Sequence, residues 1–185
     1  MLVPALGATA IPSRIIYSER PPYKSTTLPS LPQPRQEHSV AALNGRIYMV
    51  GGILGDVSLS PGDLASGFPN ITNTATMQYF DTQRRHWQDA SALPVKINHG
   101  NIATLNEKLY MLGGLSGDNL VSWDSLNSSF VYDPTRDKWS SIASIPLGLA
   151  RGASAVGVYG DEIYLAGGKW SNLRAHYFDR MSDYM

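Results

Sequence analysis

The sequence IYMVGG stands at residues 47–52, and two close variants follow it, LYMLGG at 109–114 and IYLAGG at 163–168. The Gly-Gly pairs begin at residues 51, 113 and 167, so the intervals between them are 62 and 54 residues. An apolar-Tyr-apolar-apolar-Gly-Gly unit that recurs at such intervals is typical of a repeat protein. The fold is therefore predicted by comparing the chain repeat by repeat.

The residues around the three phrases repeat as well. Each phrase follows an apolar run and a short polar turn, Asn44-Gly45, Asn106-Glu107 or Gly160-Asp161, and two apolar runs joined in this way predict a β-hairpin. Further along, QYFDTQRRHWQDASALP (78–94) matches FVYDPTRDKWSSIASIP (130–146), with equal spacing from Asp to Trp and from Trp to Pro. Each repeat is thus predicted to hold four short strands, which we letter A to D in chain order.

This pattern resembles the kelch repeat, in which a Gly-Gly pair is followed by a spaced Tyr and Trp, over residues 35–180. The resemblance implies an all-β fold, a β-propeller of four-stranded blades around a central channel. It also implies structural roles for the repeated residues, since glycine allows close backbone approach at the end of strand B and tryptophan fills the space between blades. These residues are Gly51, Gly52, Gly113, Gly114, Gly167, Gly168, Tyr79, Trp87, Tyr132 and Trp139.

The repeats divide the chain into about three blades. The expected units are an irregular segment 1–23, an isolated D-type strand 24–34, blade 1 at 35–94, blade 2 at 95–146 and a third blade at 147–185 that lacks its D strand. Propellers have 4 to 8 blades, so a partial propeller is predicted. Two interpretations are open. Either two copies join head to tail, each segment 24–34 completing the partner's third blade, or the chain is a fragment of a longer propeller, which we favour because any cut through a repeat array leaves such ends.

Composition and charge narrow the function classes. The chain has 17 Gly, 12 Pro, 10 Tyr and 4 Trp, with 16% charged residues, as expected for many short strands and turns. Its 15 basic and 15 acidic residues balance, and no Lys/Arg cluster is dense enough to neutralise several phosphates. Nucleic acid is therefore not an expected partner. No apolar stretch reaches the roughly 20 residues of a membrane helix, so no membrane span is expected.

The sequence gives few signals for the cellular location of the protein. There is no Cys, and the N-terminal MLVPALGATAIPSR lacks the basic region of a signal peptide. Two sequons begin at Asn70 and Asn127, in segments expected to be loops, and are glycosylation candidates if the protein is secreted, with chance occurrence as the equal alternative. The runs at 34–52 and 150–168 resemble a group of exported kelch proteins from filamentous fungi, which favours an extracellular location slightly.

A binding surface is predicted on one rim of the propeller, where strand A begins and the loop from strand B to strand C departs. The candidate ligand-binding residues there are Arg35, His38, Asn98, His99, Trp123, Arg151 and Trp170. Arginines on a rim offer paired donors to carboxylates. The alternative is that Arg35 and Arg151 bond carbonyls between blades, and that His38 is a buried, satisfied residue.

Enzymatic motifs are lacking. The sequence has no HExxH, GxSxG or GxxxxGK, and without Cys it cannot form the Cys-Tyr link of the copper oxidases built on kelch propellers. No catalytic residue, metal site or cofactor is predicted. The favoured function is a module that binds a protein or glycan ligand without turnover. The alternative is a small-molecule enzyme of the sugar-acid mutarotase or specifier-protein type, which the resemblance also allows.

Overall fold

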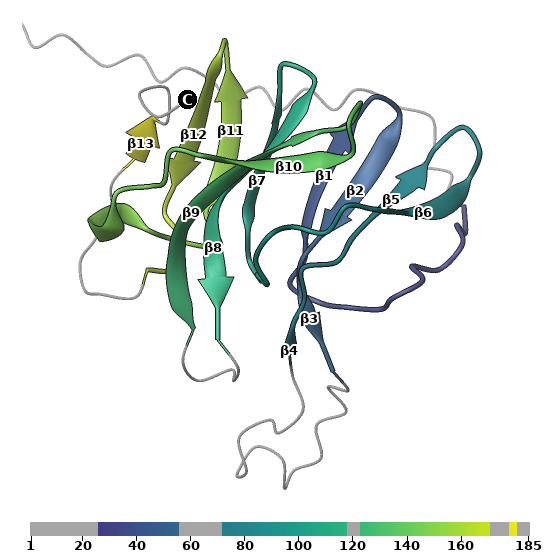
Figure 1. Ribbon diagram of the computed structural model, residues 1–185, viewed down its shortest axis with the longest axis horizontal. Coiled ribbons are helices and arrows are strands. Elements are labelled where there is room, and N and C mark those ends of the chain that lie inside the picture. The colour runs from purple at the N-terminus through teal and green to yellow at the C-terminus, as the bar shows by residue number, and fades with distance from the viewer. Residues whose placement is uncertain (1–25, 56–71, 118–122, 171–177, 181–185) are drawn as a thin grey trace, which may run out of the picture.

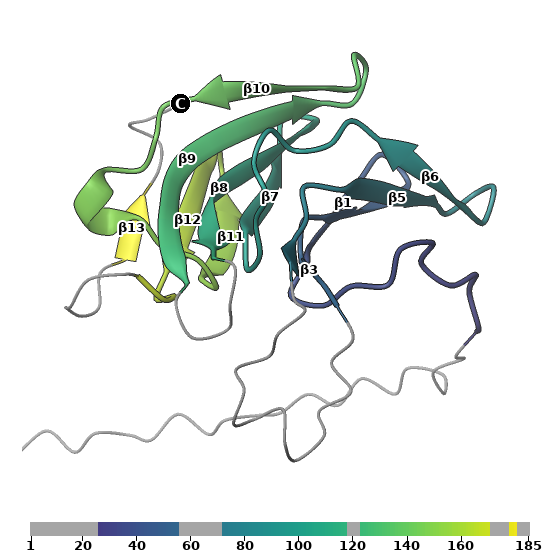
Figure 2. The ribbon, with the colours of Figure 1, turned by 60° about the horizontal axis from the view of Figure 1, so that its bottom comes forward.

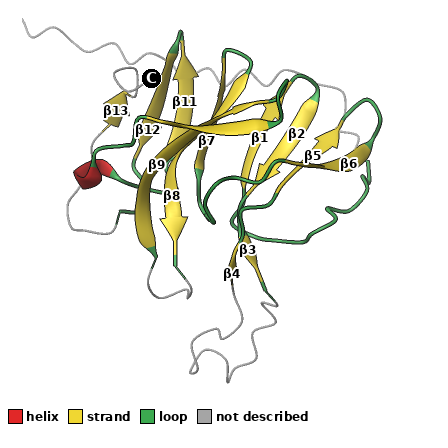
Figure 3. Ribbon diagram, in the orientation of Figure 1, coloured by secondary structure: helices red, strands yellow, loops and turns green. Residues whose placement is uncertain are grey.

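The computed structural model describes residues 26–55, 72–117 and 123–170 and the backbone of 178–180. In this part the chain is all β apart from one 3₁₀ turn, Leu147–Leu149. The strands form two four-stranded antiparallel sheets, one three-stranded sheet and a small two-stranded one. The three larger sheets stand side by side like blades (Figures 1 to 3), which confirms the predicted all-β, partial propeller. None of the described helical structure is long and apolar enough to cross a membrane.

The three larger sheets are called blades 1, 2 and 3. Blade 1 contains β1 (Ser39–Leu43), β2 (Arg46–Val50), β5 (Met77–Asp81) and β6 (His86–Ala90). Blade 2 contains β7 (Asn101–Leu105), β8 (Lys108–Ser116), β9 (Asp124–Asp133) and β10 (Lys138–Ile142). Blade 3 contains β11 (Ala155–Tyr159), β12 (Glu162–Ala166) and β13 (Phe178–Arg180). Within each blade the strands pair in chain order, so they correspond to the predicted A, B, C and, in blades 1 and 2, D strands.

The hairpin between strands A and B forms where the sequence predicts it. In blade 1, Asn44 and Gly45 have φ of 50° and 72°, and in blade 2, Asn106 and Glu107 have φ of 47° and 58°. Two consecutive turn residues with positive φ give the tight turn whose twist matches that of the flanking strands. The registers Leu43↔Arg46 and Leu105↔Lys108 follow from these turns.

Aromatic rings fill the junction between blades 1 and 2. Tyr48 packs against Tyr79 of its own blade at a centroid distance of 5.3 Å and against Tyr132 of blade 2 at 5.9 Å. Tyr132 in turn contacts Trp139 at 5.1 Å, and the Trp139 indole N–H donates to the Ser91 carbonyl oxygen at 2.9 Å. Tyr79 and Tyr132 stand one residue apart in the repeat alignment, so they point to opposite faces of their blades, and both contact Tyr48 at the junction.

The Gly-Gly pairs bring neighbouring blades into backbone contact. Gly113 has φ of 62°, and a Cβ there would lie 2.7 Å from the Arg151 carbonyl oxygen, so only glycine fits. The second glycine of the pair donates its N–H to the next blade: Gly52 to the Ile97 carbonyl at 2.7 Å, and Gly114 to the Arg151 carbonyl at 2.9 Å. The repeated phrase thus specifies blade junctions.

The predicted strand at 24–34 is not formed in its described part, residues 26–34. A strand needs a neighbour to pair with, blade 1 already has β6 as its outer strand, and Pro29, Pro32 and Pro34 lack the N–H that a ladder requires. The segment nevertheless stands where the D strand of a preceding blade would end. The Trp87 indole donates to the Pro29 carbonyl at 2.8 Å, as Trp139 does to Ser91.

The segments between strands B and C are more ordered than expected. In blade 1, β3 (Ile53–Leu54) pairs with β4 (Thr72–Asn73) at the base of the long connection. In blade 2, β8 and β9 continue to pair beyond the Gly-Gly pair, as far as Ser116↔Asp124. The second sequon was expected in a loop, which is wrong, since Asn127 lies half-buried within β9. The first, at Asn70, lies outside the described residues.

Candidate functional site

The predicted rim exists as one edge of the three blades. Just before each A strand, one residue bridges to the segment after the Gly-Gly pair, in the pairs Gln36↔Ile53, Asn98↔Leu115 and Gly152↔Lys169. The end of β3, the start of β4, the end of β8 and the start of β9 lie at the same edge, at the bottom of Figure 1. We call this edge, formed by residues 35–38, 97–100 and 151–154 and by the described ends of the B-to-C connections, the loop rim.

A chain of backbone hydrogen bonds runs along the loop rim. Glu37, His99 and Ala153 occupy the same repeat position and share the left-handed conformation, with φ of 55°, 47° and 56°. The His99 N–H donates to the Glu37 carbonyl at 2.9 Å, and the Ala153 N–H donates to the His99 carbonyl at 2.8 Å. Three successive blades are therefore held in register by equivalent main-chain groups.

A polar network crosses the rim between blades 1 and 2. The Asn73 side-chain amide donates to the Gly117 carbonyl at 2.6 Å, and Asn98 Nδ2 donates to Asn73 Oδ1 at 2.6 Å. These bonds leave Asn98 Oδ1 to accept from His99 Nδ1, which lies 2.6 Å away. His99 Nε2 lies 2.8 Å from a carboxylate oxygen of Glu37. Because the two asparagines are buried and the Glu37 side chain is 43% exposed, the network joins the blade junction to the surface.

Aromatic side chains meet basic ones at the same rim. The Trp123 ring packs against the His99 ring at a centroid distance of 4.8 Å, and the Lys169 ammonium lies 5.2 Å from the Trp123 centroid. Such ammonium–indole contacts are attractive. The Trp123 indole nitrogen is buried and has no hydrogen-bond partner. Groups from blades 1, 2 and 3 thus meet around His99.

The two candidate arginines are held by their own blades. The Arg151 side chain is 1% exposed, donates to the Leu149 carbonyl at 2.9 Å and lies over the Trp170 ring at 5.2 Å. Arg35 is half-buried and donates to the Met49 carbonyl at 3.1 Å. Both therefore bond carbonyls, as the structural alternative expects, but these carbonyls lie within a blade instead of between blades.

His38 lies beside Arg35 and apart from the polar network. Its Nδ1 is buried with no hydrogen-bond partner, which differs from the satisfied histidine that the structural alternative expects. Burial, and then the neighbouring Arg35 charge, lower the pKa of His38, so the neutral ring is favoured. Burial likewise lowers the pKa of Arg35, an effect that Asp89 opposes.

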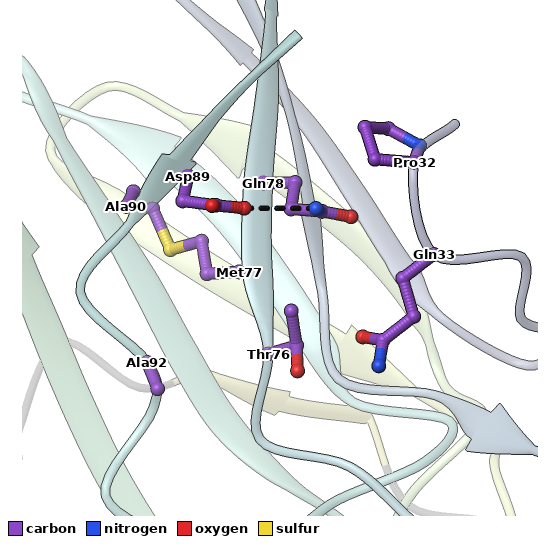
Figure 4. A pocket seen from close by; sticks show the side chains of 8 residues that line it. All are labelled: Pro32, Gln33, Thr76, Met77, Gln78, Asp89, Ala90 and Ala92. Carbon is purple, nitrogen blue, oxygen red and sulfur yellow. Dashed lines mark hydrogen bonds between the residues drawn. The ribbon is translucent and has the colours of Figure 1, made fainter. Parts of the chain in front are cut away.

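A cavity of about 370 Å³ opens on the face of blade 1 that looks away from blade 2 (Figure 4). It is lined by Pro32, Gln33, Thr76, Met77, Gln78, Asp89, Ala90 and Ala92. Gln78 donates to Asp89 at 2.8 Å and accepts from Arg35 at 3.0 Å. At the equivalent positions of Arg35 and Gln78, blade 2 has Ile97 and Phe130, both buried in the apolar junction with blade 1. The cavity therefore lies on the side of blade 1 whose counterpart in blade 2 is filled by packing against a neighbouring blade.

Among the described residues, no three His, Cys, Asp or Glu side chains are grouped so that they could hold a metal ion. The site is thus a collection of hydrogen-bonding, charged and aromatic groups. It can bind through paired polar contacts and ring faces.

Sequence reasoning missed Glu37, Asn73 and Lys169. One signal for Glu37 was available, since it stands fourteen residues before its Gly-Gly pair, as His99 does before the next (51 − 37 and 113 − 99). Asn73 and Lys169 carry no such signal, because their contacts are made with residues of other blades.

Comparisons with known proteins agree with this architecture. The Kelch motif model matches residues 99–146. The chain is 33% identical over 174 residues to the Kelch-like protein terF of Aspergillus terreus, an alignment that covers 91% of this chain and 35% of that protein. It is 28% identical to Beta-scruin of Limulus polyphemus, over 74% of this chain and 13% of that protein.

The fold has a solved counterpart in the structure of YjhT. The TM-score is 0.57 at 22% sequence identity, and the match covers 76% of this chain and 36% of the YjhT chain. This chain thus spans 35%, 13% and 36% of the lengths of these three proteins. The repeated Gly-Gly junctions, the four-stranded antiparallel blades and these similarities agree: the chain is a kelch-repeat protein with the β-propeller fold.

Proposed function

We propose that this chain is an interaction module that binds a protein or glycan ligand at the loop rim, without turnover. The observation that carries the proposal is the meeting of Glu37, His99, Trp123 and Lys169, which come from three blades. Loops and strand ends on a rigid scaffold are where binding surfaces commonly lie.

The chemistry of the rim suits both ligand classes. A carboxylate and an ammonium can each bond the hydroxyls of a sugar or the charged side chains of a peptide, and the partly exposed Trp123 ring adds apolar contact. The buried Asn73–Asn98 pair supports His99 from behind, so the rim is held in one conformation before a ligand arrives. Such preorganisation reduces the entropy that binding costs.

The test begins with the purified chain on a glycan array and against a displayed peptide library. For any ligand found, Lys169→Ala is compared with Lys108→Ala, a matched change of an exposed lysine at the start of β8, beside the A-to-B turn at the opposite edge. We expect Lys169→Ala to weaken binding about tenfold, equal to about 1.4 kcal/mol, with the urea midpoint unchanged. Equal affinities for the two variants would contradict the proposal that the ligand binds at the loop rim.

We also propose that two copies of the chain associate. The supporting observation is that blades 1 and 3 each have one face without a neighbouring blade among the described residues.

A further inference from the structure

The face of blade 3 that looks away from blade 2 has the features of a blade junction without its neighbour. Tyr159 is 79% exposed, whereas Leu105, at the same position of blade 2, is 7% exposed. A Cβ on Gly51 would lie 2.5 Å from the Ile97 carbonyl oxygen of the next blade, but nothing lies within 4 Å of the equivalent point on Gly167. Positions that are filled at the other junctions are open at this one.

The backbone groups at the two ends of the blade array are complementary. Each existing junction has one bond from the second glycine N–H to a carbonyl and one bond between residues of the rim chain. On blade 3, the Gly168 N–H and the Ala153 carbonyl make no backbone hydrogen bond within the described part of the chain. On blade 1, the equivalents of the groups that would receive them are the Arg35 carbonyl, which interacts with the His38 ring and has a second lone pair, and the Glu37 N–H. Donor therefore faces acceptor in both bonds.

The outer edge of blade 3 is complementary to the N-terminal segment. In blade 2, Met111 pairs with Phe130, which pairs with Ser141 of the outer strand. In blade 3, Leu165 takes the place of Met111 and pairs with Asp179. Alignment of the D-type segments places Thr27 where Ser141 stands, so Thr27 is the residue that belongs opposite Asp179.

One copy cannot make this pairing with itself. Figures 1 and 2 place the segment that starts at residue 26 beside blade 1 and β13 beyond blade 2, at the other end of the array. The segment is already positioned for another blade, because the Pro29 carbonyl accepts from Trp87 as the Ser91 carbonyl, which follows blade 1, accepts from Trp139 of blade 2.

The geometry points to a second copy of this chain as the occupant of the open face of blade 3. Blade 1 of one copy packs on blade 3 of the other, and residues 26–28 become the outer strand of the partner's third sheet. This inference rests on the proposed self-association and specifies its register. Two copies with three blades each make six, which lies within the range of 4 to 8 that closes a propeller.

Engineered cysteines test the register, because the chain contains no Cys of its own. Thr27→Cys and Asp179→Cys are made as two separate proteins, mixed and mildly oxidised. Opposite residues in an antiparallel pair have Cα atoms about 4.5–5.5 Å apart, which a disulfide can span. We expect a cross-linked dimer of twice 20.2 kDa from the mixture. The control mixes Thr27→Cys with Lys108→Cys, whose cysteine lies at the start of β8, beside the A-to-B turn of blade 2, and should give no cross-link.

Sedimentation velocity of the unmodified chain is measured alongside, over a range of concentrations. A dimer together with the predicted cross-link supports the inference. A dimer without it, and without a cross-link from the second pair Leu28→Cys and Phe178→Cys, overturns the register and leaves self-association standing. A monomer at every concentration overturns both. The second pair also serves if Asp179→Cys does not fold.

Discussion

The first glycine of the repeated Gly-Gly pair allows a test with two substitutions. Both place a side chain in the left-handed conformation, but only one also places it against a neighbouring blade. Gly113 and Gly167 are equivalent and have nearly the same backbone, with φ of 62° and 66°. Changing either to Ala places a Cβ in the left-handed conformation, which costs about 1 kcal/mol. Only at Gly113 does the new methyl group meet a neighbouring blade.

The additional cost at Gly113 follows from the contacts. Its Cβ would lie 2.7 Å from the Arg151 carbonyl oxygen, 2.8 Å from the Leu126 carbonyl oxygen and 3.0 Å from the Ile145 side chain. The two oxygens belong to backbone in paired strands or junctions and cannot rotate away. Forcing extra carbon into such a site costs about 1–3 kcal/mol. Gly113→Ala is therefore expected to lose about 2–4 kcal/mol of unfolding free energy and Gly167→Ala about 1 kcal/mol.

The assay is urea unfolding followed by circular dichroism, with linear extrapolation, at a concentration where sedimentation shows the monomer. The slope against urea should be the same for both variants and the parent, so that the midpoints report stability. If the two variants lose the same free energy, the contact between the Gly-Gly pair and the next blade does not stabilise the junction.

Further predictions concern the same junctions and turns. Trp139→Phe removes the indole bond to the preceding blade and should cost about 0.5–1.5 kcal/mol in urea unfolding, while Trp87→Phe, whose bond is exposed, should cost less. Asn98→Leu leaves the buried Asn73 oxygen without its donor and should cost about 1–3 kcal/mol, and a thermal melt unchanged from the parent would contradict this. The backbone N–H of Arg84 is the main cause that holds the pKa of Asp81 below its usual 3.8, so the stability from this carboxylate is present above that pH and is lost as the pH falls below it. Urea midpoints measured across this range should therefore fall less steeply for Asp81→Asn than for the parent.

The fold could be predicted from the sequence wherever local residues decide the structure. The Asn44-Gly45 turn requires two positive φ values, and the alternating strands on either side fix the register, so the hairpin needs no distant partner. The aromatic junction was predicted only in outline. That Tyr79 and Tyr132 both meet Tyr48 depends on how two blades face one another, which the spacing within one repeat does not contain.

The rim was predicted as a place but not as a set of contacts. His99 and Asn98 were identified, but their partners Glu37 and Asn73 are separated from them by 62 and 25 residues (99 − 37 and 98 − 73). Asn127 was placed in a loop because the length of β9 depends on its pairing with β8, a strand that continues through the Gly-Gly pair. Arg35 and Arg151 have the residue type of a ligand-binding pair, yet the carbonyls they bond come from their own blades and cannot be read from spacing.

The chain of main-chain bonds through residues 37, 99 and 153 has an evolutionary consequence. The bonds use only the N–H and the carbonyl of these residues, and their side chains are as different as Glu, His and Ala. Blade alignment at the rim therefore demands a residue that tolerates the left-handed conformation, but no particular side-chain chemistry. A lineage can change the residues that contact a ligand, one blade at a time, while the angle between blades is inherited unchanged.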